Sequence, residues 1–563
     1  MVDMAMRRAI LACLCLSIVV RHAQCGTVLS VLMPGPLSHL FNMKKIAEAV
    51  AARGHTVKFL VLDNNAHALQ PTDVPVLTYS IPVVKGPFDP AAMKVKGAQN
   101  FVQTVADITR VFVSGCDGIL SNDTLMAQLK DYNPELLLAE TLSPCAQVLA
   151  SKLDVPFVNF QMYAPIESVQ TSAWRGSNRN AFTPNPLAYF PQKDSGIETQ
   201  HMSFPQRLHN FVAYWKFHAG DYWHVRPIVR SAFRRFGVDP DAPKERRRMV
   251  MTMCIADFAI EWLRPLPPSY KLIGAVLPEP AQPLPADLEE FMEGAGDDGV
   301  LLVAMGTIAT LGKAEQRAMA AAFAKLPVRV LWRLSKSEVP DESAIAELKL
   351  GNNTKVATWL PQNDVLGHPR TKAFLSHCGV NGLYEAAYHG VPIIALPFLA
   401  EQRENADKAV GRGLALRLNH EDLLTGQFSH TITRVLTERS FKEVAEKLSV
   451  KLRARPRTPT QEAADWIEHA LATHGEAYLQ TPDQDLSLFV RLSLDVWAAC
   501  LVVIALVILV AAKLARLACA KLDDALIHRV SIANSKGGAA SYSSLPHTDG
   551  AETVINGAHV QSS

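Results

Sequence analysis

Short apolar runs of strand length alternate with longer stretches of helical spacing through the first half of the chain. Strand-like runs lie at 27–33, 57–62, 135–139 and 155–160, and the stretch 40–53 carries apolar residues at helical spacing before Gly54. Strands that alternate with helices are typical of βαβ units and a parallel sheet. The first half is therefore predicted to be a parallel α/β domain.

A second series of strand-like runs follows a stretch that contains Pro278, Pro280, Pro283 and Pro285. These runs lie at 300–305, 328–332, 373–376, 392–396 and 414–418, with helical patterns between them. Proline-rich segments often separate domains, so we predict an N-terminal domain at 26–277, a linker at 278–299 and a C-terminal domain at 300–455. Two facing doubly wound domains would bind ligands in the cleft at the carboxyl ends of their strands.

Both ends of the chain carry apolar segments, and the two segments differ in kind. Arg7 and Arg8 precede the short apolar run 9–20 and small residues near Gly26, a pattern typical of a signal peptide, here 1–25. The run 496–512 contains no charge and would span about 25 Å as a helix, so we predict a transmembrane helix at 492–512. A helical segment at 456–491 would lead into it.

Charges on either side of the predicted membrane helix differ in sign. Lys513, Arg516, Lys521 and Arg529 follow the span, whereas Asp483, Asp485 and Asp495 precede it. The positive-inside rule therefore predicts type I topology, with a lumenal body and a cytosolic tail at 513–563. Residues 531–563 are rich in Ser, Gly, Ala and His without apolar periodicity, so the tail is predicted to be disordered.

Composition narrows the class of protein further. The 563 residues are 48% hydrophobic and 20% charged, with a formal net charge of +2. This is enough apolar sequence for two or three cores, and the balanced charge does not favour a nucleic-acid partner.

The sequons at Asn122 and Asn352 agree with a lumenal body. Of nine cysteines, four fall in that body without C-x-x-C spacing, so one disulfide can form but no zinc site is predicted: Cys116, Cys145, Cys254 and Cys378.

Aromatic residues gather between about 184 and 235, where the α/β pattern weakens. They are Tyr189, Phe190, Phe204, Phe211, Tyr214, Trp215, Phe217, Tyr222 and Trp223. One interpretation is a packed helical excursion. The alternatives are an acceptor lid or a surface on the bilayer, where Trp and Tyr are favoured.

The run from Trp359 to Asn405 carries the most concentrated chemistry. A strand ending at His377 and a helix opening near Gly382 would aim backbone N–H groups and a helix dipole at a diphosphate, to which His377 could donate. Glu385 could accept both hydroxyls of a ribose. Trp359 offers a flat face and Gln362 an amide edge for a pyrimidine.

This run resembles the signature of the UDP-glycosyltransferases, the family that includes the UDP-glucuronosyltransferases. The resemblance extends across nearly the whole body, through Ser38-His39, Pro144-Cys145, Arg264 to Pro268, Gly306-Thr307, Leu331 to Arg333 and Trp466 to Glu468. It implies the two-domain GT-B fold, with the UDP-sugar on the C-terminal domain and the acceptor on the N-terminal domain. It also implies an endoplasmic reticulum membrane enzyme.

The family's roles pass to matching positions of this sequence. Trp359, Gln362 and Glu385 would hold uridine, and Thr307, His377 and Asn381, with Gly379 and Gly382 in the same loop, would hold the diphosphate. Glu401 and Gln402 would hold the sugar hydroxyls. Arg264 would supply a cation near the diphosphate or near a sugar carboxylate.

His39 matches the family's general base. Family members usually orient this base with an Asp, and this sequence has Glu140 there, one methylene longer. Val380 and Glu401 also depart from common family residues, which weakens any inference about the sugar. We predict an inverting transfer in which His39 deprotonates an acceptor hydroxyl and Glu140 orients His39.

No metal or other cofactor is predicted, because the two Asp-x-Asp sequences, 239–241 and 483–485, follow no apolar strand. The predicted donor is UDP-glucuronate or UDP-glucose, and the predicted acceptor is small and lipophilic. The chain is also compatible with a homo-oligomer. Two alternatives remain: a dedicated sterol or lipid glucosyltransferase, and a catalytically dead membrane-bound partner subunit.

Overall fold

The computed structural model describes residues 25–32, 37–81, 101–140, 144–162, 203–240, 242–263, 266–306, 311–398, 400–480, 486–491 and 493–536. The chain divides into two compact units, Met1–Leu486 and Ser487–Ser563. The predicted signal peptide lies almost wholly outside the described residues. The last part of the predicted tail, 537–563, also lies outside them.

The first unit contains a seven-stranded parallel sheet with the order β3-β2-β1-β4-β5-β6-β7. The strands are β1 (Thr27–Val31), β2 (Thr56–Leu62), β3 (Val76–Tyr79), β4 (Leu136–Glu140), β5 (Phe157–Gln161), β6 (Met249–Cys254) and β7 (Tyr270–Leu272). Every residue of β4 and β5 is buried. Parallel strands covered on both faces are expected to be almost continuously apolar, which explains why the sequence pattern found them.

A second parallel sheet of six strands has the order β10-β9-β8-β11-β12-β13. The strands are β8 (Val300–Ala304), β9 (Arg329–Arg333), β10 (Thr354–Ala357), β11 (Thr371–Ser376), β12 (Ile393–Ala395) and β13 (Ala415–Arg417). The two sheets confirm the predicted pair of doubly wound α/β domains. The sequence missed β3 and β10, which are partly exposed edge strands, and also β6 and β7.

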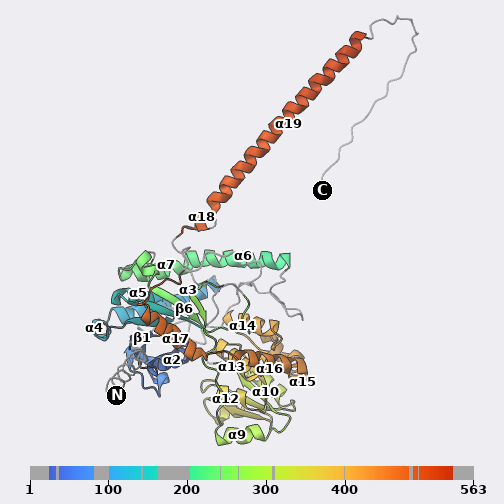
Figure 1. Ribbon diagram of the computed structural model, residues 1–563. Coiled ribbons are helices and arrows are strands. Elements are labelled where there is room, and N and C mark those ends of the chain that lie inside the picture. Colours follow the sequence, from blue (N-terminus) through green and yellow to red (C-terminus); the bar gives the residue numbers. More distant parts are fainter. Residues whose placement is uncertain are drawn as a thin grey trace, which may run out of the picture. The chain divides into compact units, whose positions relative to one another are not determined.

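Helices cover both faces of the first sheet (Figure 1). One face packs against α2 (Leu37–Ala51) and α17 (Pro459–Ala472), and the other against α3 (Phe101–Leu120), α4 (Asp123–Tyr132) and α5 (Pro144–Leu153). The 3-10 helix η1 (Asp63–Leu69) follows β2. Helices α6 (Phe204–Gly220), α7 (Arg226–Arg235) and α8 (Pro243–Arg246), with the π-helical turn η4 (Asp221–Val225), precede β6.

Helices also cover both faces of the second sheet. One face packs against α9 (Ala286–Glu293), α12 (Gln362–Gly367), α13 (Val380–His389), α14 (Ala400–Gly411) and α16 (Arg439–Arg453). The other packs against α10 (Lys313–Phe323), α11 (Glu342–Ala346) and α15 (Gly426–Thr437), and η5 (His420–Leu424) precedes α15. Helix α9 lies inside the predicted linker 278–299, yet Leu288 and Met292 are part of this core. The proline pattern therefore predicted too long a linker.

Helix α17 returns from the second sheet to the first. Ala463, Ala464, Ile467 and Ala470 are buried in the same core as α2, and Arg53 binds Asp465 at 2.8 Å. The segment predicted to lead to the membrane is thus part of the core of the first sheet. Its apolar stripe faces protein, which periodicity alone could not assign to one sheet or the other.

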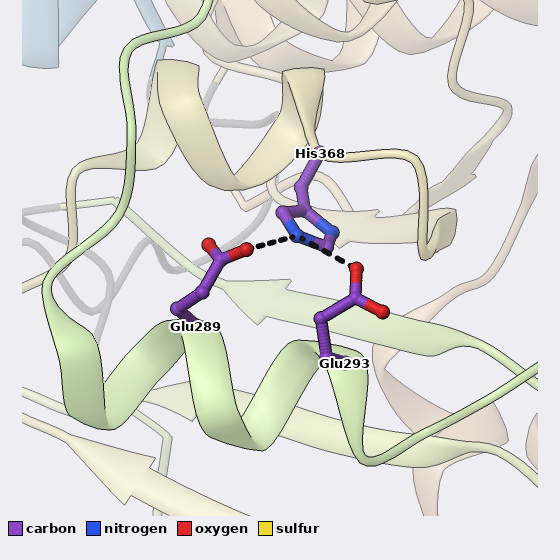
Figure 2. Close-up of side chains that lie close together, drawn as sticks. All are labelled: Glu289, Glu293 and His368. Atoms are coloured by element: carbon purple, nitrogen blue, oxygen red, sulfur yellow. Dashed lines mark ion pairs between the residues drawn. The ribbon is translucent and has the colours of Figure 1, made fainter.

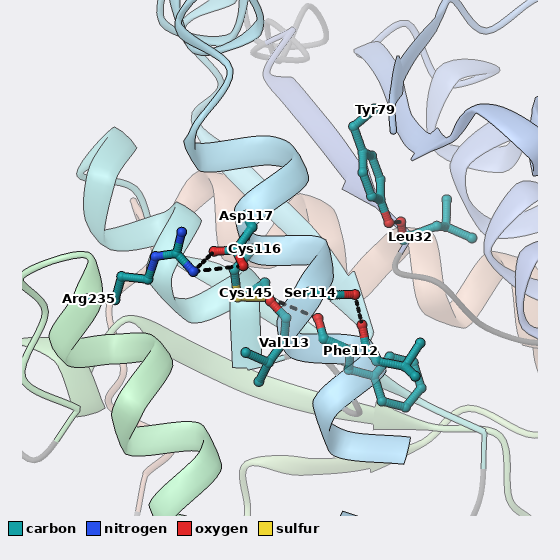
Figure 3. The surroundings of a disulfide bond; sticks show 10 residues. Leu32, Tyr79, Phe112, Val113, Ser114, Cys116, Asp117, Cys145 and Arg235 are labelled. Atoms are coloured by element: carbon teal, nitrogen blue, oxygen red, sulfur yellow. Dashed lines mark hydrogen bonds and ion pairs between the residues drawn. A yellow bond between two sulfur atoms is a disulfide. The ribbon is translucent and has the colours of Figure 1, made fainter. Parts of the chain in front are cut away.

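A disulfide joins Cys116 of α3 to Cys145 of α5 (Figure 3). Both sulfur-bearing residues are fully buried. The sequence allowed one disulfide without choosing the pair. Nearby, Arg235 of α7 binds Asp117 at 2.8 Å, so α3 is held on two sides.

The aromatic segment is helical, but the packed interpretation is wrong for its described side chains. Phe204, Leu208, Phe211, Val212 and Trp215 are all exposed along one face of α6. Tyr222 and Trp223 are exposed as well, whereas Tyr189 and Phe190 lie outside the described residues. An exposed apolar face fits the two alternatives, a lid or a bilayer surface, and not a buried excursion.

The second unit consists of α18 (Leu488–Arg491) and α19 (Leu494–Lys536). Residues Leu494–Ala533 form a helix that is long and apolar enough to cross a membrane; its most apolar 18-residue window has a mean hydropathy of 2.8 and is not buried inside the protein. The helix continues beyond the predicted span 492–512. Residues 513–536 are therefore helical, which corrects the prediction of a disordered tail over this part.

Candidate active site

The general-base candidate lies where two neighbouring strands of the first sheet end. Strands β1 and β4 pair directly. Glu140 is the last residue of β4, and His39 lies in the first turn of α2, which follows β1. Because parallel strands end at the same edge, residues 101 positions apart come together, and His39 Nδ1 contacts Glu140 Oε1.

The contact defines which nitrogen of His39 is free to accept a proton. A carboxylate can only accept a hydrogen bond, so Nδ1 carries the hydrogen and Nε2 keeps its lone pair. Burial lowers the pKa of His39, but the charge and hydrogen bond of Glu140, with Glu401 adding to them, outweigh burial and raise the pKa above its ordinary value. The Glu140 side chain is only 3% exposed, so this charge is weakly screened.

The phosphate-binding candidates lie where two strands of the second sheet end. Strand β11 pairs with β8, and His377 follows β11 directly. Gly379 is the N-cap of α13, so Val380, Asn381 and Gly382 form its first turn. Their N–H groups have no partner within the helix, and together with the helix dipole they favour an anion at this point.

Two glycines make room for the imidazole of His377. A Cβ added to Gly306 or to Gly379 would lie 2.5 Å from Nε2 of His377. Burial lowers the pKa of His377 to about 4; a hydrogen bond to the Ala304 carbonyl opposes this shift and the nearby cation of Arg333 adds to it. The imidazole is therefore neutral at physiological pH and carries a single N–H, for which an anion would compete with the Ala304 carbonyl.

Side chains around the turn hold its backbone in place. Cys378 has a positive φ of 60°, and its N–H donates to Ser376 Oγ at 3.1 Å. Asn405 of α14 donates to the Cys378 carbonyl at 3.0 Å. This support makes the conformation that exposes the first turn of α13 a stable one.

The uridine candidates gather on α12 and α13. Gln362 Nε2 donates to Glu385 Oε2, so the amide and the carboxylate are in contact. Burial raises the pKa of Glu385 to about 7, against the opposing hydrogen bond from Gln362. Trp359 is 71% exposed and leaves a flat aromatic face open. Gly382 lies inside α13, where a Cβ would contact Phe374 at 3.3 Å, so it permits close packing of the helix on β11.

The sugar candidates lie at the start of α14. Glu401 is exposed as a residue, yet desolvation of its carboxyl by the surrounding protein raises the pKa of that carboxyl. The nearby His39 opposes this rise. This electrostatic interaction indicates that Glu401 lies near His39, the general-base candidate of the first sheet. Gln402 is buried, and its Oε1 accepts the Phe398 N–H at 2.9 Å, so its carbonyl is already used within the protein.

One contact between the two halves of the site was not predicted. Asn42, one turn after His39 on α2, donates to Asn381 Oδ1 at 3.1 Å. A polar residue among the apolar positions Leu40, Met43 and Ile46 was the available signal. Arg264 and Thr307, predicted to bind the donor, lie outside the described residues.

One group of metal-ligand type occurs among the described residues, away from these predictions. Glu289 and Glu293 of α9 flank His368 at 3.5 and 3.6 Å (Figure 2). His368 Nδ1 accepts the Arg370 N–H at 3.2 Å, which places the ring hydrogen of a neutral His368 on Nε2, facing the carboxylates. Arg370 also binds Glu293 at 3.1 Å. The arrangement is therefore that of an ion-pair cluster.

Curated proteins similar to this chain match it over most of its length. The UDP-glucuronosyltransferase 2A1 of Mus musculus is 31% identical over 520 residues, covering 87% of this chain and 93% of that protein. The UDP-glucuronosyltransferase 2B1 of Rattus norvegicus is 30% identical over 524 residues, covering 89% and 95%.

Solved glycosyltransferases share the fold at lower identity. The glycosyltransferase of kitacinnamycin matches with a TM-score of 0.55 and 19% identity, covering 80% of this chain and all of that one. The calicheamicin glycosyltransferase CalG4 matches with a TM-score of 0.55 and 20% identity, covering 80% and 99%. Both support the GT-B arrangement of two parallel sheets.

A sequence model of the family described as UDP-glucoronosyl and UDP-glucosyl transferase matches residues 26–526. This match spans both sheets and reaches into α19. Together with the relatives of about 30% identity, it shows that the chain is a glycosyltransferase that uses a UDP-sugar, and that it belongs to the UDP-glucuronosyl and UDP-glucosyl transferase family.

Proposed function

We propose that the enzyme transfers a glucuronosyl or glucosyl group to a hydroxyl of a small lipophilic acceptor, with inversion at the anomeric carbon. The observation that carries this proposal is the contact between His39 Nδ1 and Glu140. Nε2 would take the hydroxyl proton as the acceptor oxygen bonds to the anomeric carbon. The bond from that carbon to the phosphate oxygen would break on the opposite face, and its electron pair would leave with UDP.

The leaving diphosphate needs a site that stabilises its charge. The first turn of α13 offers backbone N–H groups and the positive end of the helix dipole. Neutral His377 adds one N–H donor beside them. These groups support the proposal that the protein itself carries the leaving-group charge, which predicts turnover in excess EDTA.

An assay, rather than any single residue, distinguishes UDP-glucuronate from UDP-glucose and identifies the acceptor. The curated relatives are named as UDP-glucuronosyltransferases, which supports UDP-glucuronate. Glu401, the candidate for the sugar hydroxyls, would favour a neutral hexose over a glucuronate when its carboxyl is ionised. A dedicated sterol or lipid glucosyltransferase would show a narrow acceptor range in the same panel.

We also propose a type I protein of the endoplasmic reticulum membrane, with the first unit in the lumen. The Cys116–Cys145 disulfide supports an oxidising compartment for that unit. Basic residues beyond the apolar centre of α19 support a cytosolic C-terminus. Protease protection of the first unit in sealed microsomes tests this orientation.

The decisive experiment offers labelled UDP-glucuronate and UDP-glucose, with EDTA present, to a panel of phenols and sterols. We expect a β-glycoside from one α-linked donor, detected by the anomeric coupling in the product spectrum. His39→Ala should abolish turnover while UDP still raises the melting temperature. A parent protein that binds UDP but transfers neither sugar would favour the dead partner subunit.

A further inference from the structure

Asn42 is a fully buried amide on the helix that carries the general-base candidate. Its Nδ2 makes two hydrogen bonds, one to the Ser38 carbonyl at 2.8 Å and one to Asn381 Oδ1 at 3.1 Å. Its Oδ1 has no hydrogen-bond partner among the described residues. A buried acceptor without a partner is costly, so a structural role alone does not explain an amide at this position.

The two hydrogen bonds determine the orientation of both amides. The Ser38 carbonyl can only accept, so the NH₂ group of Asn42 must face it. The second hydrogen of the same NH₂ group then points at Asn381, which must present its oxygen. A rotation of the Asn381 amide would set two NH₂ groups against each other.

This orientation leaves the NH₂ group of Asn381 free. Asn381 is the second residue of α13 and is only partly buried. Its Nδ2 makes no hydrogen bond within the described part of the chain. An amide at the N-terminal turn that turns its N–H groups outward would add donors to those of the backbone.

We propose that Asn42 is a positioning residue that holds the Asn381 amide with its N–H groups toward the donor diphosphate. This inference rests on the proposed function, because it takes the first turn of α13 as the diphosphate site. It goes beyond that function because it assigns two roles to α2. The helix presents the base through His39 and orients a donor-site residue of the other sheet through Asn42.

The test compares UDP with uridine on the detergent-solubilised full-length chain. Uridine would occupy the proposed sites for the uracil ring and the ribose but not the proposed site for the diphosphate. Asn42→Asp removes both N–H donors, and the introduced carboxylate draws the Asn381 NH₂ group to itself. We expect calorimetry to show UDP affinity about ten- to thirtyfold weaker, which is about 1.4–2 kcal/mol at 1.4 kcal/mol per factor of ten, with uridine affinity unchanged.

The double variant separates positioning from direct charge repulsion. If Asn42 acts through Asn381, Asn42→Asp should cost nothing further in a chain that already carries Asn381→Ala. Losses that add in the double variant would overturn the proposal, since repulsion would persist without Asn381. Asn42→Leu, which is neutral, should weaken UDP severalfold and also spare uridine.

The outcomes distinguish this inference from the proposed function. A parent chain that does not bind UDP would refute the assigned donor site. A parent chain that binds UDP normally, with Asn42→Asp binding it equally well, would overturn only the positioning role. Equal weakening of uridine and UDP would also overturn it, because that result indicates a general structural defect.

Discussion

At the scale of single residues, the site depends on opposing effects on two titratable groups. Burial lowers the pKa of both imidazoles, His39 and His377. His39 has Glu140 beside it, which outweighs burial, whereas His377 has the cation of Arg333, which adds to burial. The same side chain is thereby suited to accept a proton at one position and to donate a neutral hydrogen bond at the other.

The first prediction concerns the pH dependence of Glu140→Gln. His39 acts as a base only when Nε2 is unprotonated, so kcat/KM falls as pH decreases through its raised pKa. Removing the Glu140 charge leaves the lowering effect of burial, so the acid limb should move to lower pH. Turnover at the optimum should fall by about two to four orders of magnitude.

Glu48→Gln provides the control, because Glu48 is a partly exposed carboxylate on the same helix. Its pH profile should match that of the parent. An unchanged acid limb in Glu140→Gln would mean that another group sets the pKa of His39.

The second prediction concerns Glu385, whose pKa is raised to about 7. The ionised carboxylate is the better acceptor for ribose hydroxyls, so uridine affinity should increase between pH 6 and pH 8. Glu385→Gln should bind uridine weakly and without this pH dependence. Uridine is the right ligand because it carries no phosphate that titrates in the same range. A flat pH profile in the parent chain would place the ribose elsewhere.

At the scale of elements, the strand ends do most to build the site. Strands β1 and β4 bring His39 to Glu140, and β8 and β11 bring Gly306 to His377. His377 directly follows β11, and α13 begins at Val380. Side chains at these strand ends therefore have positions determined by the sheet.

The third prediction tests the space beside His377. Gly379 has a φ of −59°, so alanine fits its backbone and acts only through its Cβ. That Cβ would lie 2.5 Å from His377 Nε2, so the imidazole must move. Because a hydrogen bond to a charged group contributes about 1.5–3 kcal/mol, UDP affinity should fall about tenfold or more.

Gly426→Ala is the matched control, since a Cβ at Gly426 meets nothing within 4 Å. Its UDP affinity and melting temperature should equal those of the parent. Parent-like UDP binding in Gly379→Ala would show that the imidazole of His377 does not contact the diphosphate.

At the scale of the molecule, the second sheet is attached to the first through buried charges as well as through α17. Lys408 of α14 binds Glu261, which follows β6, at 2.8 Å, and Glu404 at 2.9 Å. Arg455 binds Asp257, and the Tyr384 hydroxyl accepts the Asp257 N–H at 2.8 Å. These contacts hold the loop after β6 against the second sheet.

The fourth prediction is that Lys408→Ala strongly destabilises the first unit. The Glu261 side chain is 3% exposed, so Lys408→Ala removes a cation that offsets a buried negative charge. Breaking such a pair typically lowers the free energy of unfolding by about 3–5 kcal/mol. Urea denaturation of the full-length chain measures it.

Arg439→Ala serves as the comparison, because Arg439 is 89% exposed and pairs with Glu443 one turn away. An exposed pair contributes little, so its denaturation midpoint should stay near that of the parent. Equal midpoints for both variants would show that the buried pair does not stabilise the unit.

The sequence by itself determined the two α/β halves and the apolar C-terminal helix, and it predicted the donor run from Trp359 to Gln402. These features are local. A continuous apolar run predicts a strand buried on both faces, and polar residues that follow a strand predict a ligand-binding site at that edge of the sheet. Edge strands such as β3 and β10 were missed because partial exposure weakens that pattern. The exposed face of α6 was left among alternative interpretations, because aromatic content does not state which side of a helix is covered.

Only the tertiary structure decided which distant residues meet. The family resemblance already paired His39 with Glu140, 101 positions away, but nothing in the sequence indicated that Asn42 contacts Asn381, 339 positions away. The tertiary structure also determined that α17 packs on the first sheet and that Lys408 pairs with Glu261. Periodicity specifies which face of an element is buried, but the partner across that face follows from strand order and from the path of the chain between the two sheets.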